Sequence, residues 1–192
     1  TNIASGSAIV IDTTVPTITS FTSTTSNGSY KSAGTVNITA TASEAVVADN
    51  TITATLDTSD NVTLTAADNG TTLVGTYTVG AGDNSNDLTV SSFSIGTVTD
   101  IAGNAMASTT VPGTNIASGS AIVIDTTVPT ITSFTSTTSN GSYKSAGEVN
   151  ITATASEFVV ATNFITATLD TSDNVTLTAA DNGTTLVGTY TV

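Results

Sequence analysis

Side-chain oxygens are the groups in this chain best suited to chemistry. The 192 residues include 15 Asp and Glu but only two Lys, no His and no Cys, and the formal net charge is −13. Without His or Cys, neither Ser-His-Asp nor Cys-His catalysis is available, and no zinc site of thiolates or imidazoles can form. The remaining carboxylate and amide oxygens are the ligand types that Ca²⁺ prefers.

A tandem repeat organises these oxygens. Residues 114–192 repeat residues 1–79 with only four differences, at an offset of 113 residues. The four replaced residues Thr35, Ala45, Asp49 and Thr51 become Glu148, Phe158, Thr162 and Phe164. A unit of this length is too long for a solenoid coil and has the size of one immunoglobulin-type sandwich. We therefore predict a series of separately folded domains. Residues 1–11 would be the last strand of a preceding or partner repeat, 12–124 a complete repeat, and 125–192 a repeat lacking its last two strands.

Strict alternation of apolar residues with threonine predicts the strands. Threonine supplies 46 of the residues, and its β-branched side chain favours extended backbone. Short alternating segments are separated by Asn-, Asp- and Gly-rich turns, which is typical of a two-sheet body. The expected fold is all-β, with tandem Ig-like seven-stranded antiparallel β-sandwiches. The expected strands of the complete repeat are 15–23, 35–43, 51–57, 62–66, 71–79, 88–99 and 106–124.

Strand direction then predicts where the oxygens meet. Because successive antiparallel strands reverse direction, the start of the first strand and the loops after residues 43, 66 and 99 share one end of the sandwich, the near pole. Acids crowded there repel one another unless a cation such as Ca²⁺ joins them, whereas Asp and Asn are also ordinary turn residues. The far pole gathers Asp57, Asp60, Asp83 and Asp87. The predicted near-pole metal ligands are Asp12, Glu44, Asp68, Asp100 and Asn104, with Asp125, Glu157 and Asp181 as the copies.

The composition also excludes several functions. Two lysines cannot neutralise a run of phosphates, so we expect no nucleic-acid partner. The longest apolar runs are four to five residues, so we expect no membrane span. A pair of carboxylates alone does not make a glycosidase without an aromatic-rich cleft, and we expect no enzyme.

Four segments carry a resemblance to a known family. They are Ile-Asp-Thr-Thr-Val-Pro (11–16), Ala-Ser-Glu-Ala-Val (42–46), Gly-Thr-Tyr-Thr-Val (75–79) and Thr-Asp-Ile-Ala-Gly-Asn (99–104). Their order and spacing resemble the bacterial Ig-like repeats of giant adhesins, such as biofilm-associated proteins and type I secreted repeat-in-toxin adhesins. The resemblance implies an extracellular or cell-surface stalk. It also implies Ca²⁺ at the joints between repeats, held by aspartates such as Asp12, Asp100 and Asp125.

The leading functional hypothesis is a structural extender repeat of such an adhesin. Its partners would be neighbouring repeats or identical chains, and a distal domain would contact surface glycans or other cells. One alternative is a self-assembling extracellular filament subunit, in which a segment like 1–11 of one molecule completes another. A second alternative is a carbohydrate-binding module that uses exposed aromatics such as Tyr30, Tyr143, Phe158 and Phe164. We favour a role for Phe158 and Phe164 in packing a joint between units.

Overall fold

The computed structural model describes residues 9–192 and divides the chain into two compact units. Unit 1 is Thr1–Thr127 and unit 2 is Val128–Val192. The described residues of both units form β-strands, and unit 1 also contains one short 3-10 helix, so the all-β prediction is confirmed. In the described residues, no helix is long and apolar enough to cross a membrane.

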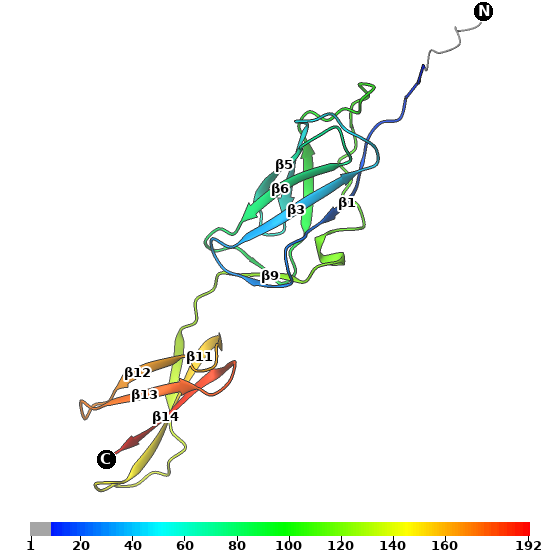
Figure 1. Cartoon of the computed structure of the whole chain (residues 1–192). Helices are drawn as coiled ribbons and strands as arrows, with labels where there is room; N and C mark the ends of the chain where they lie inside the picture. Colours follow the sequence, from blue (N-terminus) through cyan, green and yellow to red (C-terminus); the bar gives the residue numbers. More distant parts are fainter. Residues whose placement is uncertain (1–8) are drawn as a thin grey trace, which may run out of the picture. The chain divides into compact units, whose positions relative to one another are not determined.

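Unit 1 is built on a six-stranded sheet in which every neighbouring pair is antiparallel (Figure 1). Its strand order is β1-β3-β6-β5-β4-β8. These strands are β1 (Ile18–Thr22), β3 (Thr35–Ala42), β4 (Thr51–Leu56), β5 (Asn61–Ala66), β6 (Thr72–Thr78) and β8 (Val90–Ile95).

The alternation in the sequence accounts for the core of this sheet. In β3, Val36, Ile38, Ala40 and Ala42 are buried, while the residues between them face outward. Small inner side chains let the two layers approach closely, and larger residues fill the remaining space. Phe21 packs edge-on against Phe93 with ring centroids 5.6 Å apart.

A three-stranded sheet completes unit 1. It consists of β2 (Gly28–Tyr30), β9 (Ile122–Asp125) and β7 (Asn84–Ser85), in the order β2-β9-β7. The β2–β9 pair is parallel and the β7–β9 pair is antiparallel. Ile122 and Ile124 of β9 belong to the same buried cluster as the large sheet, so this small sheet covers part of the core.

The final part of unit 1 differs from the predicted strand over 106–124. Only its end is a strand, β9, and it is preceded by the 3-10 helix η1 (Ile116–Ser118). Asn115 caps η1 and also bonds to the backbone of Val90, with Val90 N donating to Asn115 Oδ1 at 3.0 Å and Asn115 Nδ2 donating to Val90 O at 2.8 Å. A side chain thus supplies the hydrogen bonds that a strand beside β8 would have supplied.

Unit 2 repeats the first five strands of the large sheet. Its order is β10-β11-β14-β13-β12, which matches β1-β3-β6-β5-β4. A second, smaller buried cluster lies on one face of this sheet. The strands are β10 (Ile131–Thr135), β11 (Glu148–Val159), β12 (Phe164–Thr168), β13 (Asn174–Ala179) and β14 (Gly183–Thr191).

The segment before β1 is extended and exposed. Residues 9–17 form no strand, and Ile9, Val10 and Ile11 are all exposed. The prediction that 1–11 is a strand of another repeat falls largely on residues 1–8, which lie outside the described residues.

Candidate metal centre

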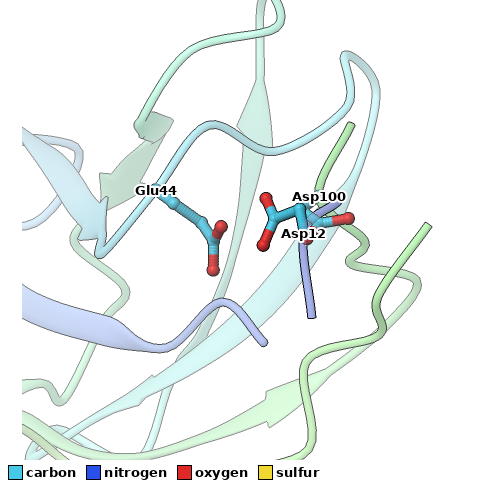
Figure 2. Close-up of side chains that lie close together, drawn as sticks. All are labelled: Asp12, Glu44 and Asp100. Carbon is cyan, nitrogen blue, oxygen red and sulfur yellow. The ribbon is translucent and has the colours of Figure 1, made fainter. Parts of the chain in front are cut away.

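Three carboxylates of unit 1 meet at one end of the large sheet. Each of Asp12, Glu44 and Asp100 offers an oxygen, and these oxygens lie within 4.8 Å of one another. Asp12 comes from the segment before β1, Glu44 from the loop after β3, and Asp100 from the loop after β8. Figure 2 shows the carboxylate of Glu44 facing the two aspartates. Strand direction had predicted that these three segments would meet.

Asp100 is held rigidly by its own loop and is only 2% exposed. Asn104 N donates to Asp100 Oδ1 at 2.7 Å, and Asn104 Nδ2 donates to Asp100 Oδ2 at 2.8 Å. Burial alone would raise the pKa of Asp100. The hydrogen bonds from the Asn104 side chain and from the backbone of Asn104, Gly103 and Ala102 outweigh burial, so the pKa lies below its ordinary value. Asp100 is therefore a fixed negative charge at neutral pH.

Asn104 also ties the segment before β1 to the body of unit 1. Its Nδ2 donates to the backbone oxygen of Asp12 at 3.1 Å. Asp12 Oδ1 in turn accepts a bond from Thr14 N at 3.0 Å, which closes a local turn. Because its amide nitrogen donates to Asp12 and Asp100, Asn104 positions the acids in this arrangement, and its role as a ligand through Oδ1 stays a prediction.

Glu44 completes the cluster, and one of its carboxylate oxygens has no hydrogen-bond donor. Its Oε1 is buried and has no hydrogen-bond partner. Burial, followed by the charges of Asp12 and Asp100, raises the pKa of Glu44 above its ordinary value. A buried acceptor without a donor, next to two further carboxylates, fits a hard divalent cation coordinated by oxygen.

The fourth predicted acid, Asp68, lies outside this cluster. Asp68 is exposed in the loop between β5 and β6. Its neighbour Asn69 accepts a bond from Ala48 N at 2.8 Å, so this loop supports the segment that carries Glu44. Asp49 adopts a φ of 64°, a conformation that Asp tolerates better than most residues. A turn requirement therefore accounts for Asp49, and its replacement by Thr162 in the second repeat shows that a carboxylate is not retained at this position.

The copies of these residues are divided between the two units. Asp125 is exposed at the end of β9 in unit 1, and its Oδ1 accepts from Thr127 N at 3.0 Å, as Asp12 does from Thr14. Glu157 of unit 2 has a buried, unpartnered Oε1, as Glu44 does. Asp181 is exposed. The present sequence contains no copy of Asp100 or Asn104.

The acids predicted at the far pole have a different role. Asp83 Oδ2 accepts from Tyr77 OH at 2.6 Å and from Gly80 N at 2.5 Å. The bond from Tyr77, and then that from Gly80, lower the pKa of Asp83 despite an opposing effect of burial. Asp57 Oδ2 accepts from Ser85 Oγ at 2.6 Å. Protein donors thus satisfy the carboxylates of Asp83 and Asp57, whereas Asp60 Oδ2 is buried without a hydrogen-bond partner.

Comparison with known proteins gives no precedent for this arrangement. No family model, curated protein or solved structure matches the chain. The interpretation of the acidic cluster therefore rests on its own geometry and on the repeat.

Proposed function

We propose that this chain is a non-catalytic extender repeat of a cell-surface or secreted adhesin, and that Ca²⁺ stiffens the joints between its repeats. The observation that supports this most directly is the contact between linker and body. Asp12, in the segment that enters unit 1, lies within 4.8 Å of Glu44 and Asp100 of the body, measured between carboxylate oxygens. A cation bound there would attach the linker to the folded unit.

The electrostatics of the cluster favour a cation. Asp100 is held charged by its hydrogen bonds, while the raised pKa of Glu44 reflects burial and the repulsion of two neighbours. A divalent ion would convert this repulsion into attraction and would give Glu44 Oε1 a partner. Three carboxylates supply only part of the six to eight oxygens that Ca²⁺ takes, so backbone oxygens and water would supply the others.

Bound Ca²⁺ would limit the freedom of the linker. Residues 9–17 belong to no strand, and Asn104 supplies one hydrogen bond that fixes Asp12 to the body. Additional bonds through the ion would restrict the backbone torsions around Asp12. In the second repeat, Asp125 and Glu157 are the residues that correspond in sequence to Asp12 and Glu44.

The proposal includes an Ig-like fold for the repeat. In such a fold, the strands lettered A, B, E and D form one sheet in that order. The order β1-β3-β6-β5 matches this arrangement when the strands are lettered along the chain without the short β2 and β7. The next two strands, β4 and β8, would be C and F and continue the same sheet, whereas an Ig fold places C and F in the other sheet. The closing strand, β9, belongs to the smaller sheet.

Calorimetric titration of the full chain with Ca²⁺, after removal of divalent ions, tests the metal site. We expect binding in the weak range of extracellular Ca²⁺ modules, about 10⁻⁴–10⁻³ M. Ca²⁺ should also raise the melting temperature of unit 1 and reduce the flexibility of the chain in solution scattering.

Two variants distinguish Ca²⁺ binding at this cluster from a general attraction of Ca²⁺ to the acidic chain. Asp100→Asn removes a fixed charge from the cluster and should abolish the binding, whereas Asp68→Asn removes an equal charge outside it and should leave binding intact. Equal effects of both substitutions, or identical melting and scattering with and without chelator, would refute the proposed Ca²⁺ site.

A further inference from the structure

The chain contains four Asn-Gly pairs, which begin at Asn27, Asn69, Asn140 and Asn182. In such a pair the backbone nitrogen of Gly can attack the side-chain amide carbon of the preceding Asn, because Gly has no side chain to shield that nitrogen. Attack requires that the Gly N–H is free of hydrogen bonds. It is also favoured when a donor already faces the amide oxygen, on which negative charge develops. The four pairs differ in these two respects.

Asn69, in the loop between β5 and β6, meets both conditions. Its side chain is exposed, and its Oδ1 accepts a hydrogen bond from Ala48 N at 2.8 Å. Gly70 N donates no hydrogen bond to any of the described residues, whereas Gly70 O accepts one from Val46 N at 2.8 Å. The loop is therefore held at its oxygens, while the nitrogen that would attack is free.

The copy of this loop in unit 2 meets only one of the two conditions. Asn182 Oδ1 accepts from Ala161 N at 2.8 Å, as Asn69 does from Ala48. Gly183 N, however, donates to Asp181 O at 3.0 Å. This hydrogen bond must break before Gly183 N can attack, although the local sequence is the same.

The remaining two pairs each lack one condition or both bonds that define it. Asn27 Oδ1 accepts from Ala121 N at 2.9 Å, but Gly28 N donates back to Ala121 O at 3.0 Å, so the attacking nitrogen is bound. In the described part of the chain, neither Asn140 Oδ1 nor Gly141 N makes a hydrogen bond, so that pair has a free nitrogen but no donor at its oxygen. Asn69 alone among the four combines the donor with the free nitrogen.

We propose that Asn69 is a self-modification site, which converts to isoaspartate without an enzyme and faster than the other three asparagines. Gly70 N forms a bond to Asn69 Cγ, and the bond between Cγ and Nδ2 breaks. The side-chain nitrogen leaves as ammonia, and the proton of Gly70 N is the third hydrogen that ammonia needs. One water molecule then opens the cyclic imide: its hydroxyl adds to the former backbone carbonyl carbon, and its proton returns to Gly70 N.

The product places a new charge beside the segment that carries Glu44. In isoaspartate the chain runs through Cγ, so the former side-chain oxygen becomes a backbone oxygen that still accepts from Ala48 N. The former backbone carbonyl becomes a free carboxylate. Position 69 therefore gains a negative charge and a longer backbone in the loop that binds Val46 and Ala48. The reaction requires no cation, so a test in chelator is independent of the proposed metal site.

Peptide mapping by mass spectrometry measures the rate at each asparagine separately. The full chain is aged in chelator at mildly alkaline pH, and isoaspartate and ammonia loss are quantified for all four pairs. Asn69 should react about threefold or more faster than Asn27 and Asn182, because those two must first break a hydrogen bond. It should also react faster than Asn140, whose oxygen has no donor. A rate at Asn69 equal to or below that of any other pair would overturn the proposal.

Gly70→Ala tests the attacking nitrogen. The added Cβ shields this nitrogen and should slow the reaction at Asn69 about tenfold or more. The fold should tolerate the change, because Gly70 has no positive φ and the atom nearest to the added Cβ is Asp68 Oδ1, the end of a flexible side chain. The rate at Asn182 in the same molecules is the internal control and should not change.

Ala48→Pro tests the donor at the amide oxygen, because proline has no N–H. Ala48 precedes Asp49, which has a φ of 64° in a tight turn, and proline suits the position before such a residue. The rate at Asn69 should fall about tenfold, while that at Asn182 stays the same. An unchanged rate at Asn69 in Gly70→Ala or in Ala48→Pro would overturn the proposal.

Discussion

The two units of this molecule carry nearly the same sequence in different surroundings. Five strands pair in the same order and register in both, so that Phe21 lies opposite Ala40 and Phe134 opposite Ala153. Their exposure nevertheless differs greatly, since Phe21 is buried and Phe134 is not. A five-stranded antiparallel sheet thus forms in both units, although β3 pairs with β6, and β11 with β14, across two intervening strands. Closure of the core in unit 1 depends on residues from 80–125.

The comparison also separates two kinds of secondary structure. The strands β3 and β11 exist because alternation specifies them and because each unit contains both of their pairing partners. The strand β2 exists only in unit 1, because it requires β9 from a distant part of the chain. A short segment without alternation takes its structure from its partner.

The largest expected difference concerns the buried phenylalanine. Phe21→Ala should destabilise unit 1 by about 3–5 kcal/mol, because it leaves a cavity beside Phe93. Phe134→Ala should cost unit 2 less than about 1 kcal/mol, since that ring is already half in water. Urea unfolding followed by NMR signals from each unit measures both values. Similar losses in the two units would mean that unit 2 is covered in solution.

Loss of the hydroxyl of Tyr77 or of its copy Tyr190 should show a smaller difference in stability between the two units. Tyr77→Phe removes the hydroxyl that donates to Asp83 and should cost unit 1 about 1–2 kcal/mol. Tyr190 donates to Asp173 at 2.9 Å at an exposed site, so Tyr190→Phe should cost unit 2 about 0.5 kcal/mol or less.

The pH dependence of the Tyr77 contact provides a second readout. Because the bond from Tyr77 lowers the pKa of Asp83 in the folded state, its stabilisation is present above the ordinary pKa of Asp and is lost as the pH falls through the lowered value. Tyr77→Phe should therefore weaken the loss of unit 1 stability in acid. An unchanged acid profile would show that Gly80 alone holds Asp83.

One of the four sequence differences between the repeats predicts a stabilising substitution in unit 2. Asp49 and Thr162 both adopt a positive φ, of 64° and 69°. A β-branched residue is strained there, while Asp is better tolerated. Thr162→Asp should stabilise unit 2 by about 0.5–1 kcal/mol, and Asp49→Thr should destabilise unit 1 by a similar amount. Changes of the same sign in both variants would contradict this explanation.

The smallest expected effect concerns the acidic cluster, and its sign depends on the cation. Since the folded-state pKa of Glu44 is raised, the stability contributed by its protonated form is complete below the ordinary pKa of Glu and is lost as the pH rises through the raised value. At neutral pH in chelator, Glu44→Gln should therefore raise the melting temperature of unit 1. In Ca²⁺ the same change should lower it.

Glu157→Gln is the matched control for this reversal. Unit 2 has no copy of Asp100, so the substitution should alter the melting of unit 2 only slightly in either condition. A reversal of sign at Glu157 as well would show that two carboxylates are sufficient for binding.

The sequence predicted the individual strands of the large sheet well because the determinants of each strand are local. The expected strands 35–43, 51–57, 62–66 and 71–79 correspond closely to β3, β4, β5 and β6. Alternation identifies such strands, and Asn- and Gly-rich turns separate them. The convergence of Asp12, Glu44 and Asp100 also followed from strand direction alone, because antiparallel order decides which loops share an end.

The remaining features depend on contacts between residues far apart in the chain. No local signal shows that Asn115 would take the place of a strand beside Val90, or that Tyr77 would satisfy Asp83. The exclusion of Asp68 from the cluster is likewise a matter of loop geometry. Such details depend on side-chain directions that a pattern of residue types does not contain.

The parallel pairing of β2 with β9 has a mechanical consequence. The segment before β1 and the end of β9 are the two points at which unit 1 is connected to the rest of the chain. Tension that pulls these points apart acts directly on β9 and on β1, which is paired with β3, and reaches β2 only through β1. Once it reaches β2, it draws the parallel strands β2 and β9 in opposite directions along their length, so their hydrogen bonds are strained together in shear. The small sheet would therefore add resistance when unit 1 is extended.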